Sequence, residues 1–327
     1  MARTIGVVAR GIRTPIVKKG DHLVDIIVDS IVKSAKSEGY ELKDRDILGI
    51  TESLLARAQG NYATLEDIAT EINNKFHGDI ALLFPILSRN RFAQVLKGIA
   101  LSGKKIYLFL NYPSDEVGNQ LMDKDMMCDL GINPYTDILK EKEYRELFGD
   151  KVKHPFTGVD YVKTYKDLAF NDNIEIFLAN DAKAALKYSD EILVANVHDR
   201  YRTKSILEKA GAKKILCLDD LLNKPINGSG YNPQYGLLGS NTATDNEIKL
   251  FPRDCEEFVN EVQKALKDRT GKNLEVMVYG DGAFKDPRGR IWELADPVVS
   301  PGYTKGLEGI PREIKLKYIA DNQLKDM

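Results

Sequence analysis

Cysteine is scarce in this chain of 327 residues, which has only three: Cys128, Cys217 and Cys255. An odd number of cysteines at such wide spacing fits neither a disulfide framework nor a zinc-binding pattern. The four histidines also lack the spacing typical of metal ligands. We therefore expect reduced thiols in a cytoplasmic protein, and no redox or zinc chemistry.

Long hydrophobic runs and an excess of one charge are also absent. No window reaches the roughly 18 apolar residues of a membrane-spanning helix. Arg10 and Arg13 interrupt the apolar residues near the N-terminus, so no secretory signal is predicted. Lys and Arg number 47 against 49 Asp and Glu, which leaves a formal net charge of −2. This balance indicates no nucleic acid and no membrane as partner.

Two common nucleotide-binding motifs are missing, the phosphate-binding loop G-x-x-x-x-G-K-[ST] and the dinucleotide fingerprint G-x-G-x-x-G. The nearest approach is residues 199–210, a basic segment that follows a predicted strand and contains Arg200, Arg202 and Lys204. Such a helix start could hold a phosphate. A solvated basic helix start is the alternative.

Strands and helices are predicted to alternate, and the length suggests two domains at roughly 100–200 residues each. Periodicity predicts strands at residues 4–8, 46–51, 80–84, 105–110, 191–197, 214–218 and 275–279. It predicts helices at residues 23–37, with Asp21 as the cap, 65–75, 92–101, 204–210, 255–267 and 315–324. Residues 115–170 show no sustained period and are expected to be an inserted, partly irregular segment. The pattern indicates a mixed α and β class.

Three polar clusters could carry chemistry. Asp245 and Asp281 each follow an apolar or small-residue run, and carboxylates at such turns can share a hard divalent ion. Either aspartate could instead be a turn residue bonded to local backbone. Glu52, Ser53 and Arg57 follow a predicted strand directly, where an Arg could contact a phosphate or simply face solvent.

Together these clusters resemble the coenzyme F-420-0:L-glutamate ligase family, the gamma-glutamyl ligases. GIRTPIVKKGDHL is similar to the family's opening segment, and DILGITESLLARAQG to the strand that follows it. GLLGSNTATDNEIKLFPRD and VMVYGDGAFKDPRGRIW resemble two later segments. The resemblance implies nucleotide-contact positions at Pro15, Ile16, Val17, Glu52, Ser53 and Arg57, and metal-ligand positions at Asp245 and Asp281. Catalytic residues stay unknown.

The resemblance also implies an α+β fold in two parts, usually within a homodimer. Residues 1–84 and 236–327 are expected to form a discontinuous gamma-glutamyl-ligase-like domain around an inserted α/β segment, residues 85–235. The implied enzyme joins glutamate to a carboxylate acceptor, using GTP or ATP and Mg²⁺ or Mn²⁺, through an acyl phosphate. The acceptor could be F-420-0, a folate or another carboxylate metabolite.

Two other functions remain open from the sequence. Gly282 stands where the family has a hydroxyl residue, which favours a non-catalytic nucleotide-binding or metabolite-binding descendant of the fold. A third hypothesis is a nucleotide-dependent enzyme with its active centre around His198, Asp199 and Arg200.

Overall fold

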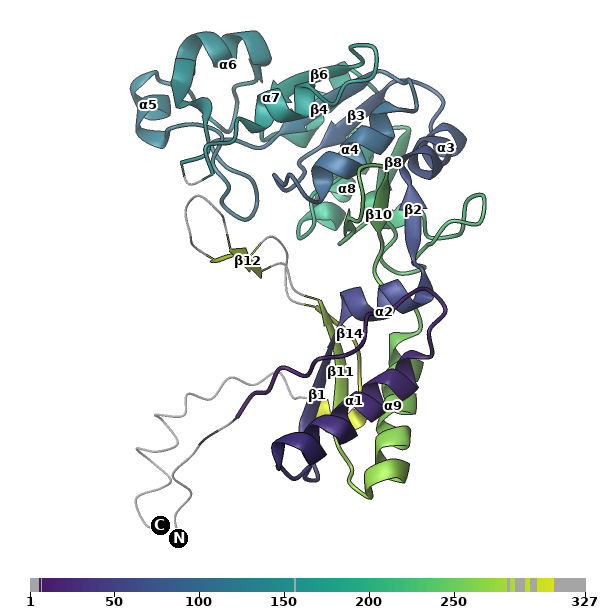
Figure 1. Ribbon diagram of the computed structural model, residues 1–327. Helices are drawn as coiled ribbons and strands as arrows, with labels where there is room; N and C mark the ends of the chain where they lie inside the picture. Colours follow the sequence, from purple (N-terminus) through teal and green to yellow (C-terminus); the bar gives the residue numbers. More distant parts are fainter. Residues whose placement is uncertain are drawn as a thin grey trace.

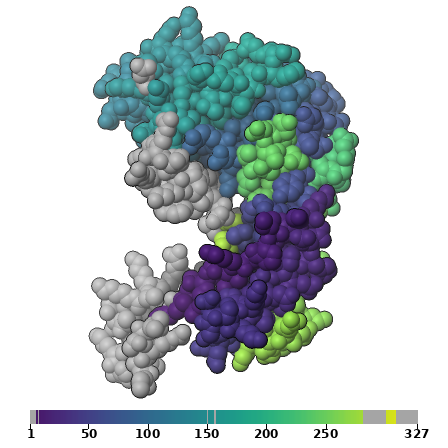
Figure 2. All heavy atoms as spheres, viewed as in Figure 1, coloured from purple at the N-terminus to yellow at the C-terminus, as the bar shows by residue number. Residues whose placement is uncertain are grey.

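The computed structural model describes residues 6, 8–155, 157–280, 283–285, 292–294 and 299–308, and it has two lobes (Figure 1). The smaller lobe combines a stretch before residue 60 with a stretch after residue 253, and the larger lobe contains the chain between them. The space-filling view shows the same two bodies (Figure 2). Helices and mixed sheets together form an α+β fold, as predicted.

The larger lobe is centred on one sheet, whose six strands are β3 (Ile80–Leu83), β4 (Ile106–Leu110), β5 (Leu139–Lys140), β6 (Ile174–Leu178), β7 (Glu191–Val194) and β8 (Lys214–Cys217). Their order is β5-β6-β4-β3-β7-β8, and all neighbours are parallel except β5 with β6. The chain adds strands first on one side of β3 and then on the other. The order of the strands therefore reverses between β3 and β7. Parallel α/β sheets form a crevice at such a reversal point, next to the carboxyl ends of the strands.

Both faces of this sheet are buried. Successive strand residues point to opposite faces, so Ile80 and Leu82 join one hydrophobic cluster while Ala81 and Leu83 join another. Such burial explains why β3 is apolar at every position. Helices of the larger lobe cover the two faces: α3 (Leu65–Lys75), α4 (Phe92–Ala100) and α7 (Tyr161–Lys166) on the first, and α8 (Arg200–Lys209) on the second.

Helices α3 and α4 approach closely at Gly98. A Cβ atom at this position would lie 2.8 Å from Ile68 Cδ1 and 2.9 Å from Ile68 Cβ. We expect Gly98→Val to lower the free energy of unfolding by about 1–3 kcal/mol, because the added atoms must push the helices apart. Urea unfolding followed by circular dichroism measures this change. Equal stability of variant and wild type would contradict the packing.

Residues 115–170, predicted to be partly irregular, contain three helices: α5 (Lys124–Asp129), α6 (Glu141–Phe148) and α7. Asp123 and Asp160 cap α5 and α7 by accepting backbone N–H groups of the first turn. Helices of 6 to 8 residues are too short to show a sustained period, so the sequence pattern did not reveal these three.

The smaller lobe places a three-stranded sheet beside two long helices. Its elements are α1 (Leu23–Glu38), β1 (Ile47–Thr51), α2 (Glu52–Gln59), α9 (Cys255–Thr270), β11 (Glu275–Gly280) and β14 (Val299–Tyr303). Central strand β11 is parallel to β1 and antiparallel to β14. Asp21 does not cap α1, since His22 holds the capping position, and the Asp21 carboxylate accepts a hydrogen bond from Lys18 N at 2.7 Å. A further hairpin pairs β12 (Ala283–Lys285) with β13 (Trp292–Leu294).

The pairing of β1 with β11 means that the larger lobe is inserted between these two strands. The cores of the lobes meet where the chain crosses, near residues 59–61 and 251–254. The division into residues 1–84 with 236–327 and an insertion of 85–235 stays a prediction. In the described part of the chain, no helix combines the length and apolar character that a bilayer span requires.

Side-chain amides hold the two crossings together. Gln59 Nε2 donates to Arg253 O at 2.7 Å, and Arg253 N donates to Gln59 Oε1 at 2.9 Å. Asn61 is fully buried, and its Nδ2 donates to Phe251 O at 2.6 Å. Next to the crossings lies a small antiparallel sheet with the order β2 (Tyr62–Thr64), β10 (Glu247–Lys249) and β9 (Asn241–Thr242). The hydrogen bonds of Gln59 and Asn61 fix α2 of the smaller lobe beside β10 of the larger lobe.

Candidate active site

Helix α2 begins directly after β1 and presents the predicted residues Glu52, Ser53 and Arg57 at the junction of the lobes. Lys249 of β10 reaches this helix from the larger lobe. Its Nζ lies 3.6 Å from Glu52 Oε1 and donates a hydrogen bond to Ser53 Oγ. The side chains of Lys249 and Glu52 are only 10% and 9% exposed, so this ion pair is shielded from water.

Positive charge predominates around this pair. Burial lowers the pKa of Lys249, and the guanidinium groups of Arg91 and Arg57 lower it further, whereas Glu52 raises it. Arg91 and Arg57 are thus the described cations that act most strongly on the Lys249 ammonium, and Glu52 is the described carboxylate that does so. We call Glu52, Ser53, Arg57, Arg91 and Lys249 the Lys249 cluster. Its balance of charge favours an anionic ligand.

The predicted nucleotide-contact segment, residues 15–17, runs beside α2 (Figure 1). Pro15 and Ile16 are exposed, while Val17 is buried in the same hydrophobic cluster as Leu55. Gly20 N donates to the carbonyl of α2 residue 58 at 2.8 Å, which holds the segment against the helix. The structure therefore brings the two predicted groups together on the smaller lobe. Contact with a nucleotide stays a prediction for all six residues.

A pocket of about 300 Å³ opens near this segment, between α2 and the first turns of α1 and α9. Its lining carries the carboxyl groups of Asp21, Asp254, Glu257 and Glu261. Carboxylates repel a phosphate unless a cation lies between them. The Lys249 cluster is the better phosphate site of the two.

Only one of the two predicted metal ligands, Asp245, lies within the described residues. Asp245 lies in the turn before β10, and its side chain is exposed. The backbone carbonyl of Asp245 accepts hydrogen bonds from Lys97 Nζ at 3.1 Å and Gln94 Nε2 at 3.3 Å. Asp281 and Gly282 lie outside the described residues. A metal site shared by Asp245 and Asp281 stays a prediction.

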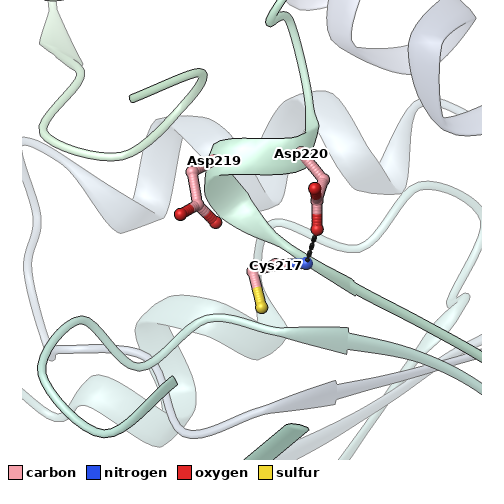
Figure 3. Close-up of side chains that lie close together, drawn as sticks. All are labelled: Cys217, Asp219 and Asp220. Carbon is pink, nitrogen blue, oxygen red and sulfur yellow. Dashed lines mark hydrogen bonds between the residues drawn. The ribbon is translucent and has the colours of Figure 1, made fainter. Parts of the chain in front are cut away.

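The described residues contain one group of three close side chains of metal-ligand type, Cys217, Asp219 and Asp220 (Figure 3). Asp220 Oδ2 accepts a hydrogen bond from Cys217 N at 2.8 Å, and Asp219 Oδ2 accepts one from Arg200 Nε at 2.9 Å. Burial, with the two carboxylates, raises the pKa of the Cys217 thiol to about 12. Both carboxylates of this group therefore already accept hydrogen bonds from the protein, with which a metal ion would have to compete.

The same burial predicts how the thiols react. Burial also raises the pKa of Cys255 to about 12, whereas Cys128 is exposed. We expect one thiol per chain to react rapidly with Ellman's reagent at pH 8 in the native protein, and three in guanidinium chloride. A Cys128→Ser variant is the control and should lose the rapid reaction. Two rapidly reacting thiols in the native wild type would contradict this account.

The basic segment after β7 is held by the protein's own acidic groups. The backbone N–H groups of Val197 and His198 donate to the Glu116 carboxylate, at 2.5 and 3.0 Å. Arg200 pairs with Asp219, while His198 and Asp199 are exposed. A carboxylate at the start of α8 competes with a phosphate, so the structure favours the solvated helix start over a phosphate site here.

A family model described as F420-0:gamma-glutamyl ligase matches residues 11–326. The chain belongs to this family. The match includes every described residue of the Lys249 cluster, and it runs through the central segment as well as both ends of the chain. Membership supports a gamma-glutamyl ligase of the F420-0 type. A search of curated proteins finds no match.

Sequence reasoning missed two members of the cluster, Lys249 and Arg91. One feature of the sequence indicates Lys249. This lysine stands among apolar residues in the string EIKLFP, directly after a predicted turn. A lysine within an apolar strand is rarely buried unless it is paired. Arg91 has no such signal, because it follows a polar loop and precedes a helix like many surface arginines.

Proposed function

We propose that this protein is a nucleotide- and metal-dependent gamma-glutamyl ligase, which joins glutamate to a carboxylate metabolite through an amide bond. The observation that carries the proposal is the shielded, cationic Lys249 cluster at the lobe junction of a chain that belongs to this family. A carboxylate becomes reactive towards an amine once it is phosphorylated, and fixed cations stabilise the charge on the transferring phosphoryl group.

The residues at the junction of the lobes would have different roles in binding the phosphates and the nucleotide. Glu52 and Ser53 orient the Lys249 ammonium, which donates hydrogen bonds to phosphate oxygens. The exposed guanidinium of Arg57 provides a second, planar donor group. Residues 15–17 would contact the rest of the nucleotide, GTP or ATP.

A divalent ion belongs to the proposal as well. Asp245 offers an exposed carboxylate, the ligand type that Mg²⁺ and Mn²⁺ prefer, and Asp281 is proposed as the second. When bound, the ion would neutralise phosphate charge. We further propose a cytoplasmic homodimer, on the family resemblance.

Thermal unfolding with each nucleotide tests the proposal. GTP or ATP, with Mg²⁺ or Mn²⁺, should raise the melting temperature, since a ligand at 100 times its Kd adds about 2.7 kcal/mol to stability. Arg57→Ala should reduce the shift, and Lys142→Ala, an exposed lysine of α6, should leave it unchanged. If neither nucleotide shifts the melting temperature with either metal, the proposal fails. A shift without glutamate-dependent turnover, on F-420-0 or a folate, would favour the non-catalytic alternative.

A further inference from the structure

A small cavity lies at the carboxyl edge of the six-stranded sheet, at the point where the strand order reverses between β3 and β7. It is lined by the segment after β3, the first turns of α4, the end of β7 and residues 237–240. Ligands of parallel α/β sheets bind at such reversal points. The cavity measures about 40 Å³, so it can hold one small group but not a whole metabolite.

Ser240 is one of the residues that line this cavity, and its hydroxyl is buried. Ser240 is 3% exposed, and its Oγ is one of two buried side-chain atoms in the described chain that have no hydrogen bond. The other is Oδ1 of Asn196, at the end of β7. A buried polar group without a partner is costly, so native proteins seldom keep one without a reason. A serine hydroxyl in a cavity can donate to a ligand oxygen.

One cationic side chain and one helix start lie at the same cavity, whose other lining residues are mostly apolar. Arg91 lines it, and its Nη1 donates to Gly239 O at 3.2 Å, which ties α4 to the loop that carries Ser240. Phe92, the first residue of α4, also lines the cavity, so the positive end of that helix dipole lies here. The nearby carboxylates are engaged by backbone: Asp115 accepts from Leu87 N at 2.8 Å, and Glu116 accepts from the end of β7.

We propose that this cavity is a subsite for the phosphate or carboxylate group of a small-molecule ligand, with the Ser240 hydroxyl as a hydrogen-bond donor. Arg91 and the start of α4 supply the positive potential. The subsite does not depend on the ligase proposal, because the cavity can bind an anion whether or not the protein forms amides.

Inorganic phosphate and acetate are the probes, titrated by calorimetry against a sodium chloride control of equal ionic strength. We expect at least one anion to bind wild type, and Ser240→Ala to weaken its binding about tenfold or more, as for a lost charge-assisted hydrogen bond. Binding of phosphate alone identifies a phosphate subsite, and binding of acetate alone identifies a carboxylate subsite. Ser37→Ala, on the exposed face of α1, should bind like wild type.

Anion binding is measured without nucleotide, glutamate or divalent metal, so its failure is distinguishable from a failure of the ligase proposal. One further measurement keeps the outcome decisive. The melting temperature of Ser240→Ala without ligand should be no lower than that of wild type, because the variant removes an unpaired hydroxyl. The proposal is overturned if neither anion binds, if Ser240→Ala binds as tightly as wild type, or if a crystal grown with the anion shows only water in the cavity.

Discussion

Lys249→Met is expected to abolish ligase activity and to lower the free energy of unfolding by about 3 kcal/mol. The variant removes one partner of a shielded ion pair, so Glu52 keeps its burial without the ammonium that offsets its charge. It also removes the hydrogen bond to Ser53 and one of the cations of the cluster. Urea unfolding gives the stability change, and amide formation from glutamate gives the activity.

The double variant Glu52→Gln/Lys249→Met separates the two effects. Replacing both partners by uncharged groups of similar shape should restore most of the lost stability, because both charges of the shielded pair are then removed together. It should not restore activity, since the cation is still missing. Full activity in the double variant would show that Lys249 acts only by pairing with Glu52.

Asn61→Ala is expected to lower the free energy of unfolding by about 2–3 kcal/mol, because it removes three hydrogen bonds of a fully buried side chain. Asn61 Oδ1 accepts from Tyr231 N at 2.9 Å and from the Arg253 guanidinium, and Nδ2 donates to Phe251 O. These bonds link both chain crossings between the lobes, so their loss should loosen the junction.

Urea unfolding of Asn61→Ala beside Asn260→Ala measures this contribution. Asn260 is exposed on α9 and donates only to the carbonyl of Glu256, one turn earlier. Its replacement should change stability by less than about 0.5 kcal/mol. Similar effects of the two variants would contradict the role of Asn61 at the crossings.

Helix length decided how much of the fold could be predicted. The helices of 16 residues, α1 and α9, show a clear apolar period, and their predicted positions agree with the structure. Strands such as β3 and β4 are also found where their apolar runs predict them. Helices α5 and α7 have 6 residues each, less than two turns, so their period could not be recognised.

Sequence separation decided how much of the site could be predicted. Glu52, Ser53 and Arg57 are close in the sequence and follow a strand, so one local pattern indicated all three. Lys249 contacts Ser53 across 196 positions. Nothing local predicts that contact, because it depends on how Gln59 and Asn61 join the two crossings.

The most direct test of the proposed ligase is a product measurement with purified protein, glutamate, F-420-0, a nucleoside triphosphate and Mg²⁺ or Mn²⁺. Mass spectrometry should detect the glutamyl amide, with one phosphate released per amide formed, as an acyl-phosphate route requires. The folded double variant Glu52→Gln/Lys249→Met should form none. Wild type that forms no amide with F-420-0 or a folate, or a double variant as active as wild type, would contradict an active site at the Lys249 cluster.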